Sequence, residues 1–228
     1  MERFRIARAE LGCQTNRGRR ATGVALLFIA LVVSGCADKR IALRYETPST
    51  FAPVSQSQPL TIYAFADRRG SEGDEGNPLR VGGIYGGYGN RLSKVMADSP
   101  FLETLVNALA AGFRARGVSV TVVGDRPIGS PAAGSRTMAL SGDIKNFSTE
   151  GRFTNSAHIS GIVRLLSPAG ALLVEKEFSE RVRSDQGGGA GVFTDVEDLQ
   201  RIMNAALAKF VERVVTDADI NAQLAVRR

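Results

Sequence analysis

The chain has 228 residues, 43% hydrophobic and 23% charged, which is enough for one globular domain and an extension. Its formal net charge of +6 lies mostly at the start: residues 1–35 hold six Arg and two Glu, and the remainder has 23 Lys and Arg against 21 Asp and Glu. We therefore expect no nucleic-acid partner, since such proteins carry a basic binding domain. Cys13 and Cys36 precede the expected domain, which excludes a disulfide or a cysteine-ligated metal within it.

The first predicted element is an export signal. Residues 1–20 are rich in Arg, and residues 24–33 (VALLFIALVV) are ten consecutive apolar residues. Ten residues are too few for a membrane-spanning helix, which needs about 20, but they fit the apolar region of a secretory signal. We predict that residues 1–35 form a signal peptide that is removed.

The end of this run and the three residues after it, Val33-Ser34-Gly35-Cys36, resemble the lipobox of bacterial lipoproteins. The resemblance implies cleavage before Cys36 and acylation of its thiol and amine, which would anchor the protein firmly in a membrane. Ala37 stands where an aspartate often retains lipoproteins in the inner membrane, so we predict the periplasmic face of the outer membrane. The alternative is an uncleaved apolar anchor with an unmodified cysteine.

Residues 36–59 are predicted to form the lipidated cysteine and an extended linker. Ile41, Leu43 and Tyr45 alternate with polar residues, which indicates a short strand. Residues 47–59 are rich in Pro, Ser, Thr and Gln, which is typical of a spacer that lifts a domain off a membrane. The same residues could equally lie along the domain as an ordered arm.

A single domain is predicted over residues 60–228. Its first strand is residues 60–69, and the glycine-rich residues 79–96 form two short strands or a hairpin. The alternating residues predicted on one face of the first strand are Leu60, Ile62, Ala64 and Ala66.

A helix follows, with clear signals at both ends. Ser99 is predicted as its N-cap, Pro100 as its first residue and Gly117 as the left-handed residue that closes it. Residues 118–123 form the next strand.

The second half of the domain begins with a three-stranded antiparallel meander, and the sequence PAG at 168–170 is a turn within it. The last helix starts with a capping box of Thr194 and Glu197 and runs to about Thr216, after which Asp217 caps a short terminal turn. The strands of the meander are residues 137–147, 158–167 and 171–183.

This order of elements predicts an α+β fold. We expect an antiparallel or mixed sheet of about five to six strands, with two amphipathic helices packed on one face.

Residues 36–225 also resemble the YajG family of bacterial outer-membrane lipoproteins. The likeness rests on the lipobox, on LTIYAFADRR and FLETLVNALAAGFRARG, on the meander, and on a final helix that ends in DADINAQL. The resemblance implies an envelope lipoprotein, and Cys36 is the one site residue that carries over.

The glycine-rich tract GGIYGGYGNR lacks the lysine of a phosphate-binding loop, so we expect a glycine-kinked hairpin. Tyr85 and Tyr88 in this tract are candidate contacts for a glycan or a protein. Asp67, Arg68 and Arg69 form an ordinary polar strand end or a second candidate recognition surface.

Residues with catalytic or metal-binding chemistry are sparse. His158 is the only histidine, and although Ser156 and Ser160 share its strand face, no orienting acid accompanies them. The acidic loop lacks the ligand spacing of a calcium loop; its residues are Glu72, Asp74 and Glu75. We expect no metal and no other cofactor.

These observations predict a non-enzymatic envelope lipoprotein that binds a protein or polymer of the envelope. One alternative is an auxiliary or carrier subunit of lipid or lipopolysaccharide transport, which would need an apolar groove between helices and sheet. A periplasmic hydrolase is a poorer alternative, because the catalytic constellation is missing. The oligomeric state is left open.

Overall fold

The structure is a computed structural model that describes residues 38–48, 51–54, 57–70, 77–85, 88–124, 136–151, 154–184 and 195–225. Cys36, Thr194 and the acidic loop with Glu72, Asp74 and Glu75 lie outside these residues. Within them, no helix has both the length and the apolar character needed to cross a bilayer.

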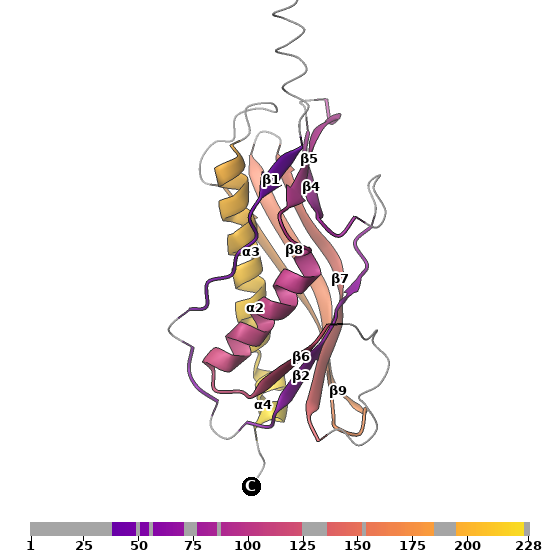
Figure 1. Cartoon of the computed structure of the whole chain (residues 1–228), viewed down its shortest axis with the longest axis vertical. Helices are drawn as coiled ribbons and strands as arrows, with labels where there is room; N and C mark the ends of the chain where they lie inside the picture. Colours follow the sequence, from indigo (N-terminus) through magenta and orange to yellow (C-terminus); the bar gives the residue numbers. More distant parts are fainter. Residues whose placement is uncertain are drawn as a thin grey trace, which may run out of the picture. The chain divides into compact units, whose positions relative to one another are not determined.

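The sheet is organised around one long strand, β7 (Met138–Gly151). One edge of β7 pairs antiparallel with β8 (Asn155–Leu166), and β8 pairs antiparallel with β9 (Leu172–Arg183). The predicted meander is therefore confirmed (Figure 1).

The other edge of β7 is shared by three short strands, all parallel to it. They follow one another along the edge as β2 (Leu60–Tyr63), β3 (Ala66–Asp67) and β4 (Arg80–Tyr85). Three further strands lie beyond these: β6 pairs with β2, β5 with β4, and β1 with β5. Their bounds are Lys39–Ile41 for β1, Arg91–Ala97 for β5 and Val120–Val123 for β6.

The sheet thus has nine strands, and the prediction of five to six was too low. The predicted strand at 60–69 divides into β2 and β3, and Phe65 between them is buried in place of the predicted Ala64. A short strand near Ile41 and one within 118–123 were predicted, but the division of 60–69 was not, because strands of two and four residues are too short to show a hydrophobic period.

Two helices cover one face of the sheet, as predicted: α2 (Phe101–Ala115) and α3 (Val196–Thr216). Along β8 the residues facing the helices, such as Ile159 and Val163, are fully buried, whereas His158 and Arg164 on the opposite face are half-buried. This alternation is that of a sheet with one covered and one solvated face. A third, short helix, α4 (Ala218–Leu224), follows α3.

The helix ends differ from prediction by one residue. Pro100, not Ser99, is the N-cap of α2, and the Ser99 hydroxyl instead lies 3.1 Å from that of Thr104. At α3, Asp195 is the N-cap and accepts a hydrogen bond from the Glu197 amide at 3.0 Å.

The closing signals are confirmed. Gly117 adopts a φ of 85° directly after α2, and the Asp217 carboxylate caps α4. These positions were predictable because glycine and aspartate each supply a local geometry that other residues rarely supply.

Residues 38–58 lie along the domain where they are described, which is the ordered-arm alternative. After β1, the Ala42 amide donates to Gln200 Oε1 at 2.9 Å and the Arg44 amide to Asn204 Oδ1 at 3.0 Å, both on α3. Further on, the Val54 amide donates to the carbonyl of Arg116 and the Gln58 amide to that of Leu224. The arm is thus tied to the helices at several points.

Two glycines allow β7, β8 and Phe65 to pack closely. A Cβ atom on Gly142 would lie 2.5 Å from Phe65 Cε1 and still closer to the Ile162 carbonyl oxygen. One on Gly161 would lie 2.6 Å from the Asp143 carbonyl oxygen. The sheet can take this form only if both positions lack side chains.

Replacing Gly142 with alanine therefore tests this packing. We expect Gly142→Ala to lower the free energy of unfolding by about 1–3 kcal/mol, because backbone and Phe65 must shift. Gly124→Ala is the control, since its Cβ would meet no atom within 4 Å. Urea titrations followed by circular dichroism measure both, and equal stability of the two variants would contradict the packing.

Candidate functional site

The β4–β5 hairpin presents its two tyrosines differently. Tyr88 is fully exposed in the turn, next to Gly89, which has a φ of 81°. Tyr85 is half-buried at the end of β4, where its ring lies over Gly83. Of the two predicted contact residues, Tyr88 is therefore the one whose ring is open to a partner.

Asp67 has a structural role. Its carboxylate accepts two hydrogen bonds from the Arg69 guanidinium, from Nε at 2.9 Å and from Nη2 at 2.6 Å. Burial raises the pKa of Asp67, but the hydrogen bonds and charge of Arg69 outweigh it and hold the pKa below its usual value.

Arg69, which the sequence placed with Asp67 and Arg68 at a strand end, is the central residue of this cluster. Its side chain is only 12% exposed, donates from Nη1 to the Arg80 carbonyl at 2.9 Å and lies over the ring of Phe101. Phe101 in turn stacks on Phe147 of β7 with ring centroids 3.7 Å apart. The cluster joins β3, β4, α2 and β7.

Arg68 is separate from Asp67 because adjacent strand residues point to opposite faces. Its side chain is 71% exposed, and Nε lies 3.7 Å from Asp143 Oδ1. Asp143 is bound more closely by Arg164 at 2.6 Å, and Arg164 also binds Glu175. These pairs run across the solvated face from β7 to β9. The Arg68 side chain is exposed, so its pair with Asp143 contributes little to stability, whereas the Arg164–Asp143 pair is partly buried.

His158 lies on the same solvated face. Its Nε2 is 3.1 Å from the hydroxyl of Ser179, a residue of β9 that sequence spacing could not indicate. Burial, and secondarily the charge of Arg181, lowers the pKa of His158. Ser156 and Ser160 share the strand, and the hydroxyl paired with the histidine is that of Ser179 instead.

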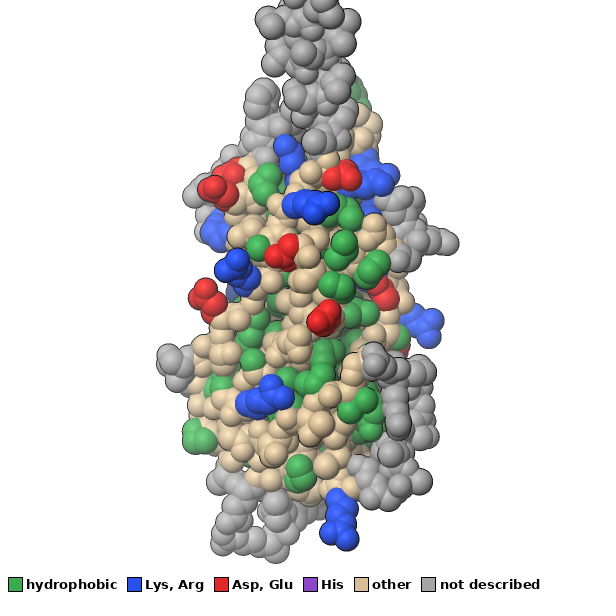
Figure 2. All heavy atoms as spheres, in the orientation of Figure 1, with side chains coloured by type: hydrophobic (Ala, Val, Ile, Leu, Met, Phe, Trp, Pro, Cys, Tyr) green, Lys and Arg blue, Asp and Glu red, His purple; other side chains and the backbone are tan. Residues whose placement is uncertain are grey.

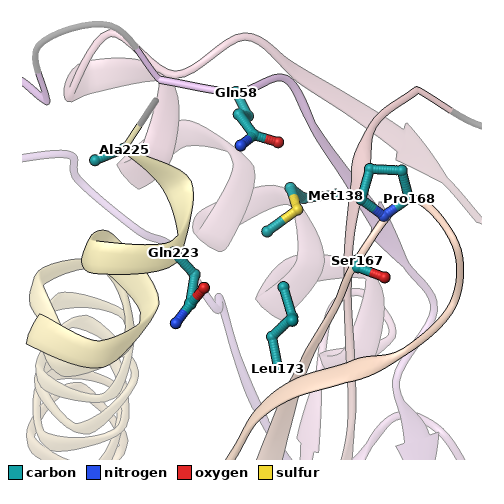
Figure 3. Close-up of a pocket in the computed structure, with 7 residues that line it drawn as sticks. All are labelled: Gln58, Met138, Ser167, Pro168, Leu173, Gln223 and Ala225. Atoms are coloured by element: carbon teal, nitrogen blue, oxygen red, sulfur yellow. The ribbon is translucent and has the colours of Figure 1, made fainter. Parts of the chain in front are cut away.

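A pocket of about 290 Å³ opens at the end of the sheet where β7 begins. Ser167, which lines the pocket, is nine positions after His158, a distance of about 30 Å along an extended strand. The pocket and His158 therefore do not form one site. Four separate segments line the pocket, and no charged side chain is among its residues (Figure 3): Gln58, Met138, Ser167, Pro168, Leu173, Gln223 and Ala225.

Exposed leucines adjoin the pocket. The β8–β9 turn closes with the Gly170 amide donating to the Ser167 carbonyl, and Gly170 takes a φ of 85°, as the PAG sequence predicted. Leu172 and Leu173 follow at once and remain 54% and 38% exposed. We call the pocket and these two leucines the apolar end of the domain.

A buried polar cluster lies at the opposite end of the sheet, where α3 begins. Asp198 accepts hydrogen bonds from Asn155 Nδ2 at 2.7 Å, from the Ser184 hydroxyl at 2.9 Å and from Arg201 at 2.6 Å. Burial raises the pKa of Asp198, but these three donors outweigh it and lower the pKa overall. The cluster ties the starts of β8 and α3 to the end of β9.

The Asp198 cluster leads to a pH-dependent prediction. Because the folded state lowers the pKa of Asp198, its contribution is complete above the unfolded pKa near 4 and is lost as pH falls through the folded value. We expect Asp198→Asn to cost about 1–3 kcal/mol at pH 7 and less at pH 3. Urea unfolding at both pH values measures this, with exposed Asp195→Asn compared in parallel. A loss that does not shrink at pH 3 would contradict it.

Comparison with known proteins gives a shared fold. No family model matches the chain, and no curated protein matches it. A protein of Xanthomonas campestris assigned to family DUF330 has a solved structure that aligns over 81% of this chain and 97% of its own, with 16% identity and a TM-score of 0.58.

Two other solved structures are less similar. An uncharacterised protein covers 78% of this chain and 97% of its own, with 15% identity and a TM-score of 0.48. The PelC dodecamer of Paraburkholderia phytofirmans covers 73% and 91%, with 13% identity and a TM-score of 0.40. TM-scores below 0.5 do not establish a shared fold. None of these structures is identified as a YajG protein, so the resemblance to that family stays a prediction. The chain shares its fold with the DUF330 protein.

Proposed function

We propose that this chain is a bacterial envelope lipoprotein, acylated at Cys36, that works without catalysis by binding an envelope partner. Its place is the periplasmic face of the outer membrane. The observation that carries the binding role is a closed core combined with an exposed apolar end. An apolar surface of this kind is typical of sites that bind other macromolecules.

The closed core favours a binding module over a lipid carrier. A carrier would need an open apolar groove between helices and sheet, but side chains from both layers fill this interface in the described part of the domain. The residues of α3 that face the sheet are fully buried: Leu199, Met203, Leu207, Phe210 and Val214. The 290 Å³ pocket is also at the small end of the range for ligand sites, about 300–1,000 Å³.

The apolar end suits a protein segment as partner. Its residues supply amide and hydroxyl groups from Gln58, Gln223 and Ser167 beside the apolar side chains of Met138 and Leu173. Such a mixture matches a peptide chain, which offers backbone hydrogen bonds together with an apolar side chain. The face seen in Figure 2 carries charged side chains of both signs, with hydrophobic side chains between them.

The non-catalytic role is supported by the setting of the His158–Ser179 pair. Both residues lie on the solvated sheet face, and Arg181 is the residue opposite His158 on β9. Nucleophilic catalysis would also require oxyanion donors and a substrate cleft beside this pair. The described pocket lies far from it.

A charge at the apolar end tests the binding role. We expect the double variant Leu172→Glu, Leu173→Glu to lose at least about tenfold of its partner crosslinks in intact envelopes, because a charge must then be desolvated on binding. Ser179→Glu is the matched control, since it adds a charge at an exposed position of the same strand. Mass spectrometry of the captured species measures both. Undiminished crosslinks in the double variant, or recovery of lipid alone, would refute the proposal.

Acylation is tested separately with Cys36→Ser. We expect this variant to remain unlabelled by radioactive palmitate and uncleaved, because an alcohol does not replace the thiol in this modification. Gel mobility and membrane fractionation are the measurements, with Cys13→Ser as the control that still matures. A Cys36→Ser protein that is processed and partitions with membranes would disprove the lipobox assignment.

A further inference from the structure

The arm leaves almost no spacer between Cys36 and the sheet. β1 begins at Lys39, three residues after Cys36, and Asp38 is the first described residue. In the sequence only Ala37 separates Cys36 from Asp38, and two residues of extended chain span about 7 Å at most. The described residues between 42 and 58 are tied to α2, α3 and α4, which is the ordered arm and not the spacer of the two alternatives for residues 47–59.

The strand pairing identifies the end of the domain at which this attachment point lies. β1 is parallel to β5, with Lys39 opposite Val95, so the chain before Lys39 runs toward the start of β5 at Arg91. Tyr85 at the end of β4 is opposite Arg91, so Tyr88, three residues before Arg91, is at that end. Figure 1 shows β1, β4 and β5 together at one end of the domain. Gly151, the last residue of β7, pairs with Ile84 at the same end.

The apolar end is at the other extreme of β7. Met138 lines the pocket and is the first residue of β7, whereas Gly151 is the last. Thirteen residues separate them, about 40 Å in an extended strand. An anchor at Cys36 would thus hold one end of the sheet at the bilayer and keep the apolar end far from it.

We propose that Tyr88, which lies shortly before β5, contacts the membrane and that its ring enters the lipid headgroup layer. This inference rests on the proposed acylation of Cys36 and adds the orientation of the domain. Tyrosine is enriched at membrane interfaces because its ring is apolar and its hydroxyl polar. Tyr88 is fully exposed to water in the isolated chain, and the short tether brings its turn to the bilayer surface.

The tyrosine ring, and not net charge, carries this contact. Exposed Arg40 and Arg91 lie on strands β1 and β5 beside the turn, but exposed Asp38 and Glu150 lie at the same end. The charges there largely offset one another. The contact should therefore be nearly independent of the fraction of anionic lipid.

The absence of tryptophan from the sequence provides a sharp test. Tyr88→Trp and Leu172→Trp each place a single tryptophan, one at the turn and one at the apolar end. Each acylated full-length product is purified in detergent and reconstituted into phosphatidylcholine vesicles, with or without bromine atoms on the acyl chains near the headgroups. Bromine quenches tryptophan fluorescence on close approach.

We expect brominated lipid to reduce the emission of the tryptophan at position 88 at least about twofold, as for a ring at the interface. The emission of the tryptophan at position 172 should not change, and replacing a quarter of the lipid with phosphatidylglycerol should alter neither result. Equal quenching at both positions, or none at position 88, would overturn the inference.

A separate measurement distinguishes failure of the proposed acylation from failure of the proposed orientation. Mass spectrometry of the purified protein before reconstitution shows whether Cys36 carries acyl chains. A protein without them refutes the lipoprotein proposal and the orientation together. An acylated protein whose tryptophan at position 88 is unquenched refutes only the orientation.

Discussion

The pairing of β7 along both edges is the constraint on which the rest of the structure depends. One edge is occupied by β8, and the other is divided among β2, β3 and β4. The close contact of Gly142 and Gly161 with neighbouring backbone and Phe65 allows these strands to meet without a void. Since interiors are packed as densely as crystals, the helices that cover this face have a defined surface to fill.

The same arrangement separates chemical roles in space. The covered face holds the apolar core, and the opposite face carries ion pairs between strands β7, β8 and β9. The two ends of β7 also differ: one has the attachment point of the N-terminal segment, and the other has the uncharged pocket and the exposed leucines. In the proposed function, the anchor and the partner-binding surface lie at these opposite ends of β7.

Sequence reasoning succeeded where the signal was local. The meander, the two amphipathic helices, the left-handed Gly117 and the Asp217 cap were all predictable from residue type and spacing. The prediction of the N-cap residue was wrong by one position at α2 and α3, where adjacent residues can both serve as the cap. The pairing of short strands with distant partners was also not predicted. Asp67 and Arg68 show the same limit, because the partner that defines Asp67 is Arg69, whose burial depends on Phe101 of a distant helix.

The sequence by itself determined the α+β class and the covered face of the sheet, since each depends on residues close together in the chain. Only the tertiary structure decided that residues 38–58 form an arm, that Tyr88 and not Tyr85 is exposed, and that four segments meet in one pocket. The physical reason is that these features arise from contacts between residues as much as about 160 positions apart, such as Arg44 with Asn204. No local periodicity encodes such pairings.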